Sequence, residues 1–315
     1  MSSKTIVTAC DHNFVWGTYL LLLSLRRHGV KLPVHVVTHN LGEVDCALLK
    51  QVGGVTLFKA ADEANHRNIV YQKTAAILTA DSDLILWIDS DSIVTGDITP
   101  LIDATGEGLQ IRMRPEKELA YLFKKRYMPG ERRGTLPGKV LDIWRKDVGA
   151  RQTPAINTSC NAHCFAVHRR HLDFIRRWDA QIRRVIPDDA PAGVVNDSSF
   201  AYFLLDEAVM SSMLAFSEGP PPVKRYTMED DPSCSVVHFG GRPKPWQRWL
   251  LRNMEYFDEV VGLLEWAEAQ GWLLPATPWF LQRKHKRRCL VFALLFEVRR
   301  RFRRALHGLW KKTYN

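Results

Sequence analysis

A run of five apolar residues at positions 84–88, Leu-Ile-Leu-Trp-Ile, is followed at once by Asp89, Ser90 and Asp91. Polar residues bound the run on both sides, which is typical of a strand buried on both faces of a sheet. Open α/β sheets bind ligands at the carboxyl ends of such strands, and two close carboxylates repel unless a cation lies between them. The segment therefore predicts either a divalent-cation site or, as for many isolated Asp-x-Asp pairs, a solvated turn.

Strand-like and helix-like patterns alternate through the first part of the chain, with turn residues between them. This alternation predicts a mostly parallel sheet with right-handed crossovers, which is the α/β class. The expected strands are residues 5–9, 34–38, 55–58 and 84–88, and the expected helices are residues 14–27, 45–51 and 69–78.

The second part of the chain predicts further elements of the same kind. Residues 124–147 are rich in Arg, Lys, Gly and Pro, and we interpret them as either an acceptor-side loop or a solvated insertion. The expected strands are residues 109–112, 162–167 and 235–239, the last of these in the core, and the expected helices are residues 172–186 and 197–216.

The cysteines and the amino terminus favour a cytoplasmic protein. The six cysteines are scattered, and Cys160 and Cys164 lack the second close pair of a zinc site, so we expect reduced, mostly buried thiols. The chain enters an apolar strand without a secretion signal. Its apolar runs are shorter than the roughly 18 residues of a spanning helix.

The net charge of +10 belongs to the tail. Residues 283–312 carry twelve Lys or Arg and one acid, which leaves 32 basic and 33 acidic residues elsewhere. Apolar residues in the tail recur every three or four positions with arginines between them, as in a basic amphipathic helix on an anionic membrane surface. A helix packed on its own domain is the alternative. The apolar positions are Val291, Leu294, Leu295, Val298, Phe302, Ala305 and Leu309.

We therefore expect three parts in the chain. Residues 1–250 would form the catalytic domain, residues 251–282 a helical extension, and residues 283–315 the membrane-associating tail. With a neutral body and a basic tail, the chain differs from a nucleic-acid-binding protein, whose main binding face is usually basic.

A second polar motif follows the strand expected at residues 235–239. His238 lies at its end, Gly240 and Gly241 allow the backbone to approach a ligand closely, and Lys244 can reach a phosphate held there. On residue type alone, His238 is either a metal ligand or a hydrogen-bonded structural histidine.

Two consecutive acids stand inside the helix expected at residues 197–216. Asp206 and Glu207 lie between apolar pairs, so they are either buried acids that need partners or a pair at a helix start.

The two polar motifs together resemble the retaining glycosyltransferases of family 8, which include glycogenin and bacterial lipooligosaccharide galactosyltransferases. Leu-Trp-Ile-Asp89-Ser90-Asp91 looks like the strand-plus-DxD signature of that family. His238-Phe-Gly-Gly241-Arg-Pro-Lys244-Pro-Trp246 is similar to its His-x-x-Gly-x-x-Lys-Pro-Trp motif. The resemblance implies a GT-A fold, a nucleotide-binding αβα sandwich, with a UDP-sugar donor and manganese, or magnesium, as the metal.

The resemblance also implies roles for single residues. Asp89, Asp91 and His238 would hold the metal, and Gly241 and Lys244 would contact the diphosphate. The remaining nucleotide and donor contacts would be Thr8, Ala9, Asp11 and Asn13 in the first-strand loop, together with Lys73, Ser90 and Asn157. Asp206 matches an acid that binds hydroxyls of the donor sugar.

The sequence departs from the family at two places. The family commonly has Asp-Gln where this chain has Asp206-Glu207, and small-Gly where it has Thr158-Ser159. Glu207 would then be either a stronger nucleophile or a selector of a different sugar. Two routes stay open: the leaving phosphate oxygen takes the proton of the acceptor, or a covalent glycosyl intermediate forms on Glu207.

The function expected from these features is metal-dependent, retaining transfer of a hexose from a UDP-sugar to a surface-glycan acceptor. The acceptor would belong to lipopolysaccharide, capsule or exopolysaccharide, at the cytoplasmic face of the membrane. One alternative is a sugar-nucleotide nucleotidyltransferase, which needs a glycine-rich basic loop that residues 8–13 do not contain. Another is a nucleic-acid-binding protein that acts through the basic tail.

Overall fold

The structure is a computed structural model. It describes residues 2–60, 70–186, 199–226, 236–272, 274 and 276–313, and it describes side chains up to residue 303. The strands are β1 Lys4–Asp11, β2 Val34–His39, β3 Val55–Lys59, β4 Leu84–Ile88, β5 Ser92–Val94, β6 Leu109–Met113, β7 Cys160–His168, β8 Val223–Tyr226 and β9 Val236–His238. The α-helices are α1 Val15–Arg27, α2 Glu43–Lys50, α3 Val70–Leu78, α4 Thr99–Asp103, α5 Glu116–Leu122, α6 Gly138–Val148, α7 Leu172–Val185, α9 Asp206–Phe216, α10 Phe257–Ala269 and α11 Lys286–Thr313.

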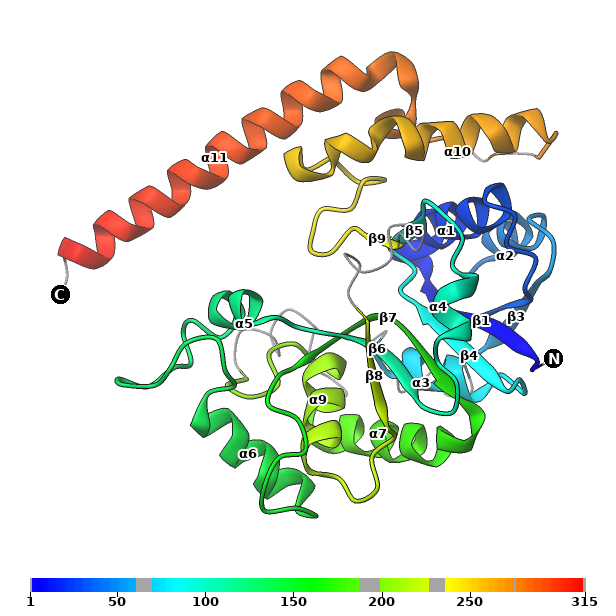
Figure 1. The fold of residues 1–315 in the computed structure, drawn as a ribbon. Coiled ribbons are helices and arrows are strands. Elements are labelled where there is room, and N and C mark those ends of the chain that lie inside the picture. The colour runs from blue at the N-terminus through cyan, green and yellow to red at the C-terminus, as the bar shows by residue number, and fades with distance from the viewer. Residues whose placement is uncertain are drawn as a thin grey trace.

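Seven strands form the central sheet, in the order β3-β2-β1-β4-β7-β6-β8 (Figure 1). The strands β3, β2, β1 and β4 are parallel. β7 runs antiparallel to both β4 and β6, and β8 is parallel to β6. The expectation of an α/β fold with a mostly parallel sheet is therefore confirmed.

Helices cover both faces of this sheet, so the chain forms three layers. One core joins strand residues to α1, α2 and α10, and the other joins them to α3, α6, α7 and α9. In β1, Ile6 packs into the first core and Val7 into the second. Because both faces of the central strands are buried, those strands are apolar throughout rather than alternating.

The five cysteines of the described residues form no disulfide with one another, and four of them are buried. This agrees with the expectation of reduced, mostly buried thiols; Cys234 lies outside the described residues.

The interpretation of residues 124–147 as a loop or insertion is wrong over its second half. α6 occupies Gly138–Val148, and Val140 and Trp144 on its inner face are fully buried. Only these two positions, one helical turn apart, are buried, so the apolar period is too short to stand out in the sequence. The flanking residues give the better signal: Pro137 precedes the helix, and Gly149 ends it with φ 78°.

Two other expected elements also differ. The helix expected at residues 197–216 begins only at Asp206, because Leu205 has φ 50°, a value incompatible with a right-handed helix. The strand expected to close the core is β9, but it pairs with β5 in a separate two-stranded sheet. The sheet edge is instead β8, for which the sequence analysis had no strand. Residues 197, 198 and 235 lie outside the described residues.

The C-terminal helices differ in how they contact the body. α10 packs on α1 in the first core, whereas α11 extends away from it (Figure 1). At the start of α11, Cys289 and Ala293 are buried, and Arg283 just before it forms ion pairs with Asp258 and Glu265. The tail is therefore helical, as expected, and its first turns pack on the domain.

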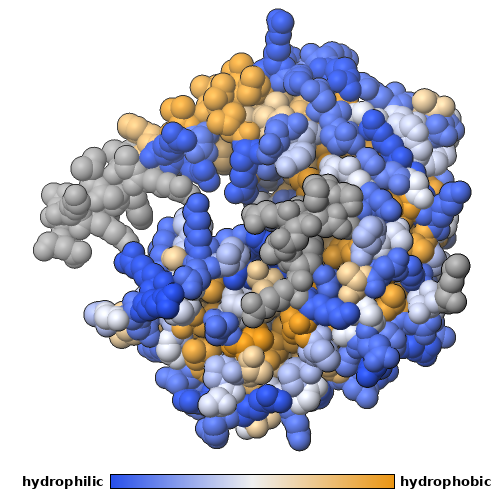
Figure 2. All heavy atoms as spheres, viewed as in Figure 1, coloured by the Kyte–Doolittle hydropathy of each residue, from blue (hydrophilic) through white to orange (hydrophobic). Residues whose placement is uncertain are grey.

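On the side that does not pack on the domain, and along its further turns, α11 exposes an apolar surface, which Figure 2 shows as a patch of hydrophobic side chains. Its residues are at least 40% exposed, and they are Leu290, Val291, Phe292, Leu294, Leu295, Val298 and Phe302. Ala305 and Leu309 lie beyond the described side chains. Within the described ranges, no helix has the length and apolar character needed to cross a bilayer.

Two helical glycines allow a matched test of how tightly α1 packs beside the DxD segment. A Cβ at Gly17 would lie 2.4 Å from Cη2 of Trp246 and 2.5 Å from the Ser90 carbonyl oxygen. The carbonyl oxygen belongs to the backbone, so it could move away only if the main chain shifted. We expect Gly17→Ala to lower the free energy of unfolding by about 1–3 kcal/mol. Chemical denaturation measures this change.

The control is Gly262→Ala in α10, where an added Cβ meets only the flexible end of Arg27, at 3.1 Å. Since alanine is the better helix former, this variant is expected to be neutral or slightly stabilised. Equal losses in the two variants would contradict close packing at Gly17.

Candidate functional site

Two acids and an imidazole meet where the two sheets join. β4 ends at Ile88 and β5 begins at Ser92, so Asp89 and Asp91 lie in the short connection between the sheets. β9 pairs with β5 so that His238 lies opposite Ser92. The Nε2 atom of His238 is 3.2 Å from Oδ1 of Asp91 and 3.8 Å from Oδ2 of Asp89.

This arrangement fits a divalent cation. One ligand atom from each of Asp89, Asp91 and His238 lies within 4.8 Å of the others, and among the described residues no other group of three His, Cys, Asp or Glu does so. Ligands at roughly 2.0–2.6 Å from one ion are separated by distances of this size. Carboxylate oxygens suit magnesium and manganese, and the imidazole favours manganese.

Lys244 lies on the far side of Asp91. Its ammonium group pairs with Oδ2 of Asp91 and donates to the carbonyl of Phe239 at 3.0 Å. Burial acts to raise the pKa of Asp91, but its contacts with His238 and Lys244 outweigh burial and hold the pKa below its usual value. Gly241, with φ 81°, makes the turn that returns the chain to Lys244.

Lys73, from α3, connects the DxD segment to the start of α9. Its Nζ lies 3.0 Å from Oδ1 of Asp89 and 2.7 Å from Oδ2 of Asp206, and it donates to the Ala162 carbonyl at 2.9 Å. Burial would lower the pKa of this lysine, but the carboxylates of Asp206 and Asp89 raise it above its usual value. Lys73 is therefore a buried cation shared by two acids.

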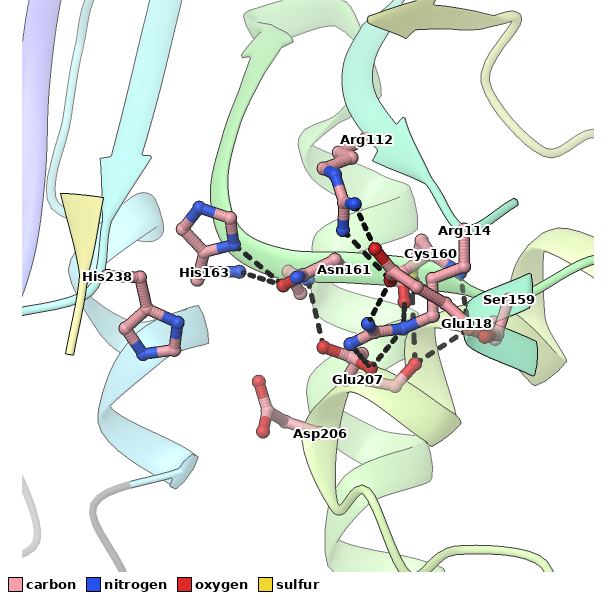
Figure 3. A network of polar contacts seen from close by, with 12 residues as sticks. Arg112, Arg114, Glu118, Ser159, Cys160, Asn161, His163, Asp206, Glu207 and His238 are labelled. Carbon is pink, nitrogen blue, oxygen red and sulfur yellow. Dashed lines mark hydrogen bonds and ion pairs between the residues drawn. The ribbon is translucent and has the colours of Figure 1, made fainter. Parts of the chain in front are cut away.

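Asp206 and Glu207 both lie at the start of α9; Asp206 is buried and Glu207 is partly buried, so both interpretations of this pair hold in part. The positive φ of Leu205 turns the chain into the first turn of α9. Glu207 pairs with Arg114 at 2.5 Å, and Figure 3 shows Asp206 on the side facing His238. Burial raises the pKa of Glu207, although Arg114 opposes this.

The loop after β1 lies against the segment that follows β9. The indole of Trp246 donates to the carbonyl of Asn13 at 3.1 Å, and its ring meets Phe14 edge to face. Asp11 accepts from the backbone N–H of Asn13 at 2.8 Å. Thr8 is fully buried in β1, with no hydrogen-bond partner for its hydroxyl among the described residues.

A cavity of about 170 Å³ opens beside the acids, which is smaller than the roughly 300–1,000 Å³ typical of small-molecule sites. Its lining combines charged groups with the aromatic rings of Phe14 and Trp87. The sequence analysis had not assigned these two rings to the site. The lining residues are Ala9, Phe14, Lys73, Trp87, Asp89, Ser90, Asp91 and Asp206.

Asn157 is exposed before β7 and does not line this cavity. The asparagine near the site is Asn161, within β7, whose Oδ1 lies 2.7 Å from Nδ1 of His163. The buried His163 ring stacks on His238, with centroids 4.9 Å apart. The sequence analysis missed Asn161 and His163, although Asn161-Ala162 repeats the Asn-small pattern four residues after Asn157.

Comparison of the sequence with protein-family models gives no match, and comparison with the curated proteins gives none either. Solved structures do match. The bifunctional glycosyltransferase WbbM has a TM-score of 0.55 and 16% identity, over 89% of this chain and 51% of WbbM. The galactosyltransferase LgtC, solved with donor and acceptor sugar analogues, has a TM-score of 0.51 and 17% identity, over 86% of this chain and 98% of LgtC.

The glycosyltransferase GlyE of Streptococcus pneumoniae TIGR4 has a TM-score of 0.50 and 14% identity, over 86% of this chain and 64% of GlyE. The chain thus spans about half of WbbM and nearly all of LgtC. At these identities the likeness defines the fold alone. The chain has the GT-A fold of these glycosyltransferases.

The contacts of Lys73 predict a large stability cost for removing its charge. Lys73→Met leaves Asp89 and Asp206 buried without their shared cation, and breaking such a pair costs about 3–5 kcal/mol. Denaturant titration of the metal-free protein should detect this loss. Lys50→Met, at an exposed position of α2, is the control and should change stability by less than about 0.5 kcal/mol.

Proposed function

We propose that this chain is a metal-dependent retaining glycosyltransferase, related to family 8, that moves a hexose from a UDP-sugar to a glycan acceptor. The observation that carries the proposal is the group of Asp89, Asp91 and His238 beside a cavity in a GT-A fold. Residues about 150 positions apart in the sequence meet there with the donor atoms that a divalent cation requires.

In this proposal Asp89, Asp91 and His238 hold the cation. When bound, the cation supplies Lewis-acid stabilisation to the charge that grows on the departing diphosphate. Lys244 adds a second positive group at the other carboxylate oxygen of Asp91, Oδ2, and its burial limits how far it can move. A fixed cation beside developing charge is worth more than one that must reorganise during the reaction.

The nucleotide is proposed to lie along the loop after β1. Thr8, Ala9, Asp11 and Asn13 would contact the uridine, with Ser90 beside them. Ala9 and Ser90 line the cavity, whereas Thr8 is fully buried in β1 and does not line it.

The sugar is proposed to lie at the start of α9. Asp206 lines the cavity and would accept hydrogen bonds from sugar hydroxyls, with Lys73 fixing its position. Glu207 stands where the family resemblance implies a glutamine. LgtC has also been solved as an active-site mutant with glutamate in place of glutamine, at a TM-score of 0.50 and 16% identity. A carboxylate at an active-site glutamine is thus compatible with this fold.

The acceptor is proposed to be a membrane-linked glycan at the cytoplasmic face. α11 exposes apolar side chains such as Leu295 and Val298 and carries many arginines. Such a helix binds an anionic bilayer through buried apolar area and about 1 kcal/mol per basic residue. Docking there would bring the site to a lipid-linked substrate.

Metal-dependent UDP release tests the proposed activity. We expect purified protein to release UDP from at least one UDP-sugar when manganese is present, and chelation should stop the reaction. Asp91→Asn should lower the rate by at least about 100-fold, because the metal contributes several kcal/mol.

The control for this variant is Asp81→Asn, at a side chain that is 92% exposed, which should keep the wild-type rate. Turnover of a UDP-sugar by Asp91→Asn at the wild-type rate would refute the metal assignment.

Membrane association is tested with the apolar surface of α11. Leu295→Asp combined with Val298→Asp puts charge at positions that are 59% and 64% exposed. Binding to vesicles rich in anionic phospholipid should fall by at least about tenfold, with Tm unchanged, because the apolar contribution is lost. Val44→Asp, at a 72% exposed position of α2, should keep wild-type binding in the same sedimentation assay. Unchanged binding of the double variant would argue against this surface.

A further inference from the structure

The ion pair between Arg114 and Glu207 occupies one oxygen of the Glu207 carboxylate. Nη2 of Arg114 lies 2.5 Å from Oε1 of Glu207, and Nε lies 3.1 Å from the same oxygen. Both side chains are less than 15% exposed. Two charge-assisted hydrogen bonds in a buried position hold this oxygen strongly.

The second carboxylate oxygen of Glu207 also accepts a hydrogen bond from the protein. Oε2 of Glu207 accepts from the backbone N–H of Ala162 at 3.3 Å. The main chain is fixed as well, because the hydroxyl of Ser211 donates to the Glu207 carbonyl at 2.9 Å and accepts from the Cys160 N–H at 3.1 Å. Neither carboxylate oxygen is therefore directed to the cavity, which Asp206 lines and Glu207 does not.

Arg114 also makes hydrogen bonds to groups other than Glu207. Its Nη1 donates to Oε2 of Glu118 at 2.9 Å, and its Nε donates to the Cys160 carbonyl at 3.2 Å. Glu118 in turn pairs with Arg112 (Figure 3). The four charged groups sum to zero, and the guanidinium cannot rotate without breaking several of these contacts.

We infer that Arg114 is a positioning residue: its ion pair keeps the Glu207 carboxylate outside the cavity. The carboxylate that faces the sugar is then that of Asp206. This inference rests on the proposed function. It selects between the two routes of transfer, one in which the leaving phosphate oxygen takes the acceptor proton and one in which a glycosyl group is bonded to Glu207. Transfer proceeds without a bond between Glu207 and the anomeric carbon.

The reason is geometric and energetic. A nucleophile must bring a free oxygen to about 3–3.5 Å from the reacting carbon. For Glu207 that movement would break its contacts with Arg114 and Ala162. Arg114 and Arg112 would then share the single carboxylate of Glu118, and an uncompensated charge in a largely buried position is costly. Asp206 reaches the cavity without any such change.

The test is a double-variant cycle with two readouts, Tm and the rate of UDP-sugar turnover. Glu207→Gln leaves Arg114 to share Glu118 with Arg112, an excess of one positive charge, so we expect a Tm several degrees lower and a slower rate. Adding Arg114→Met removes this excess charge, so the double variant should regain most of the Tm and turn over at least about tenfold faster than Glu207→Gln. Arg145→Met and Asp142→Asn, an exposed pair on α6, are the control cycle and should show no coupling.

A covalent role for Glu207 gives the opposite kinetic result. Neither Glu207→Gln nor the double variant has the carboxylate, so both would be equally inactive, whatever their Tm. A double variant that regains Tm but no rate overturns the inference.

Intact-mass measurement of the wild-type protein provides an independent readout. With UDP-sugar present and acceptor absent, we expect no added hexosyl mass; a hexosyl group on Glu207 overturns the inference even if the double variant fails to fold. Wild-type protein that releases UDP from no sugar nucleotide overturns the proposed function instead, and the Tm cycle alone still reports whether Arg114 and Glu207 act as a pair.

Discussion

Three carboxylates crowd into one cavity, and the site depends on the two lysines that pair with them. Asp89, Asp91 and Asp206 all line the same space, where burial disfavours ionised acids. Lys73 neutralises Asp89 and Asp206 together, and Lys244 neutralises Asp91. With two cations for three acids, the region keeps an excess of negative charge that the imidazole of His238 and a divalent ion can balance.

Topology brings these charges together from distant parts of the chain. The break between β4 and β5 puts both aspartates at the carboxyl edge of the sheet, and the pairing of β5 with β9 delivers His238 to the same point. The chain then continues to Lys244 and Trp246, whose indole packs on Gly17 and hydrogen-bonds to Asn13. A single stretch of about ten residues thus supplies a metal-ligand candidate, an ammonium group and the hydrogen bond that holds the loop after β1.

The sequence predicted the parts of the fold and site that depend on local pattern. Both faces of the central strands are buried, so their apolar runs are unmistakable, and Asp89, Asp91 and His238 follow directly from strand ends. α6 was missed because only Val140 and Trp144 define its inner face. The pairing of β9 with β5 could not be predicted from either strand. Each strand has only three residues, and so short a pattern does not specify which residues pair.

Arg114 and His163 show the same limit in the site itself. Each lies within or just after a strand, and each acquires its partner from an element far along the chain: Arg114 from α9, and His163 from β9. Side-chain pairing between distant strands and helices is a product of tertiary packing, which residue order alone does not encode. By contrast, Lys73 was found because a family resemblance, not a pattern, pointed to it.

The backbone of Ala162 makes two of these contacts: its carbonyl accepts from Nζ of Lys73, and its N–H donates to Oε2 of Glu207. The backbone of one small residue thus joins the charges that line the cavity to the Arg114–Glu207 pair outside it. A tilt of β7 at this point alters both sets of contacts at once. The free energies of these two sets of contacts are consequently coupled, so that a change at Lys73 also affects Glu207.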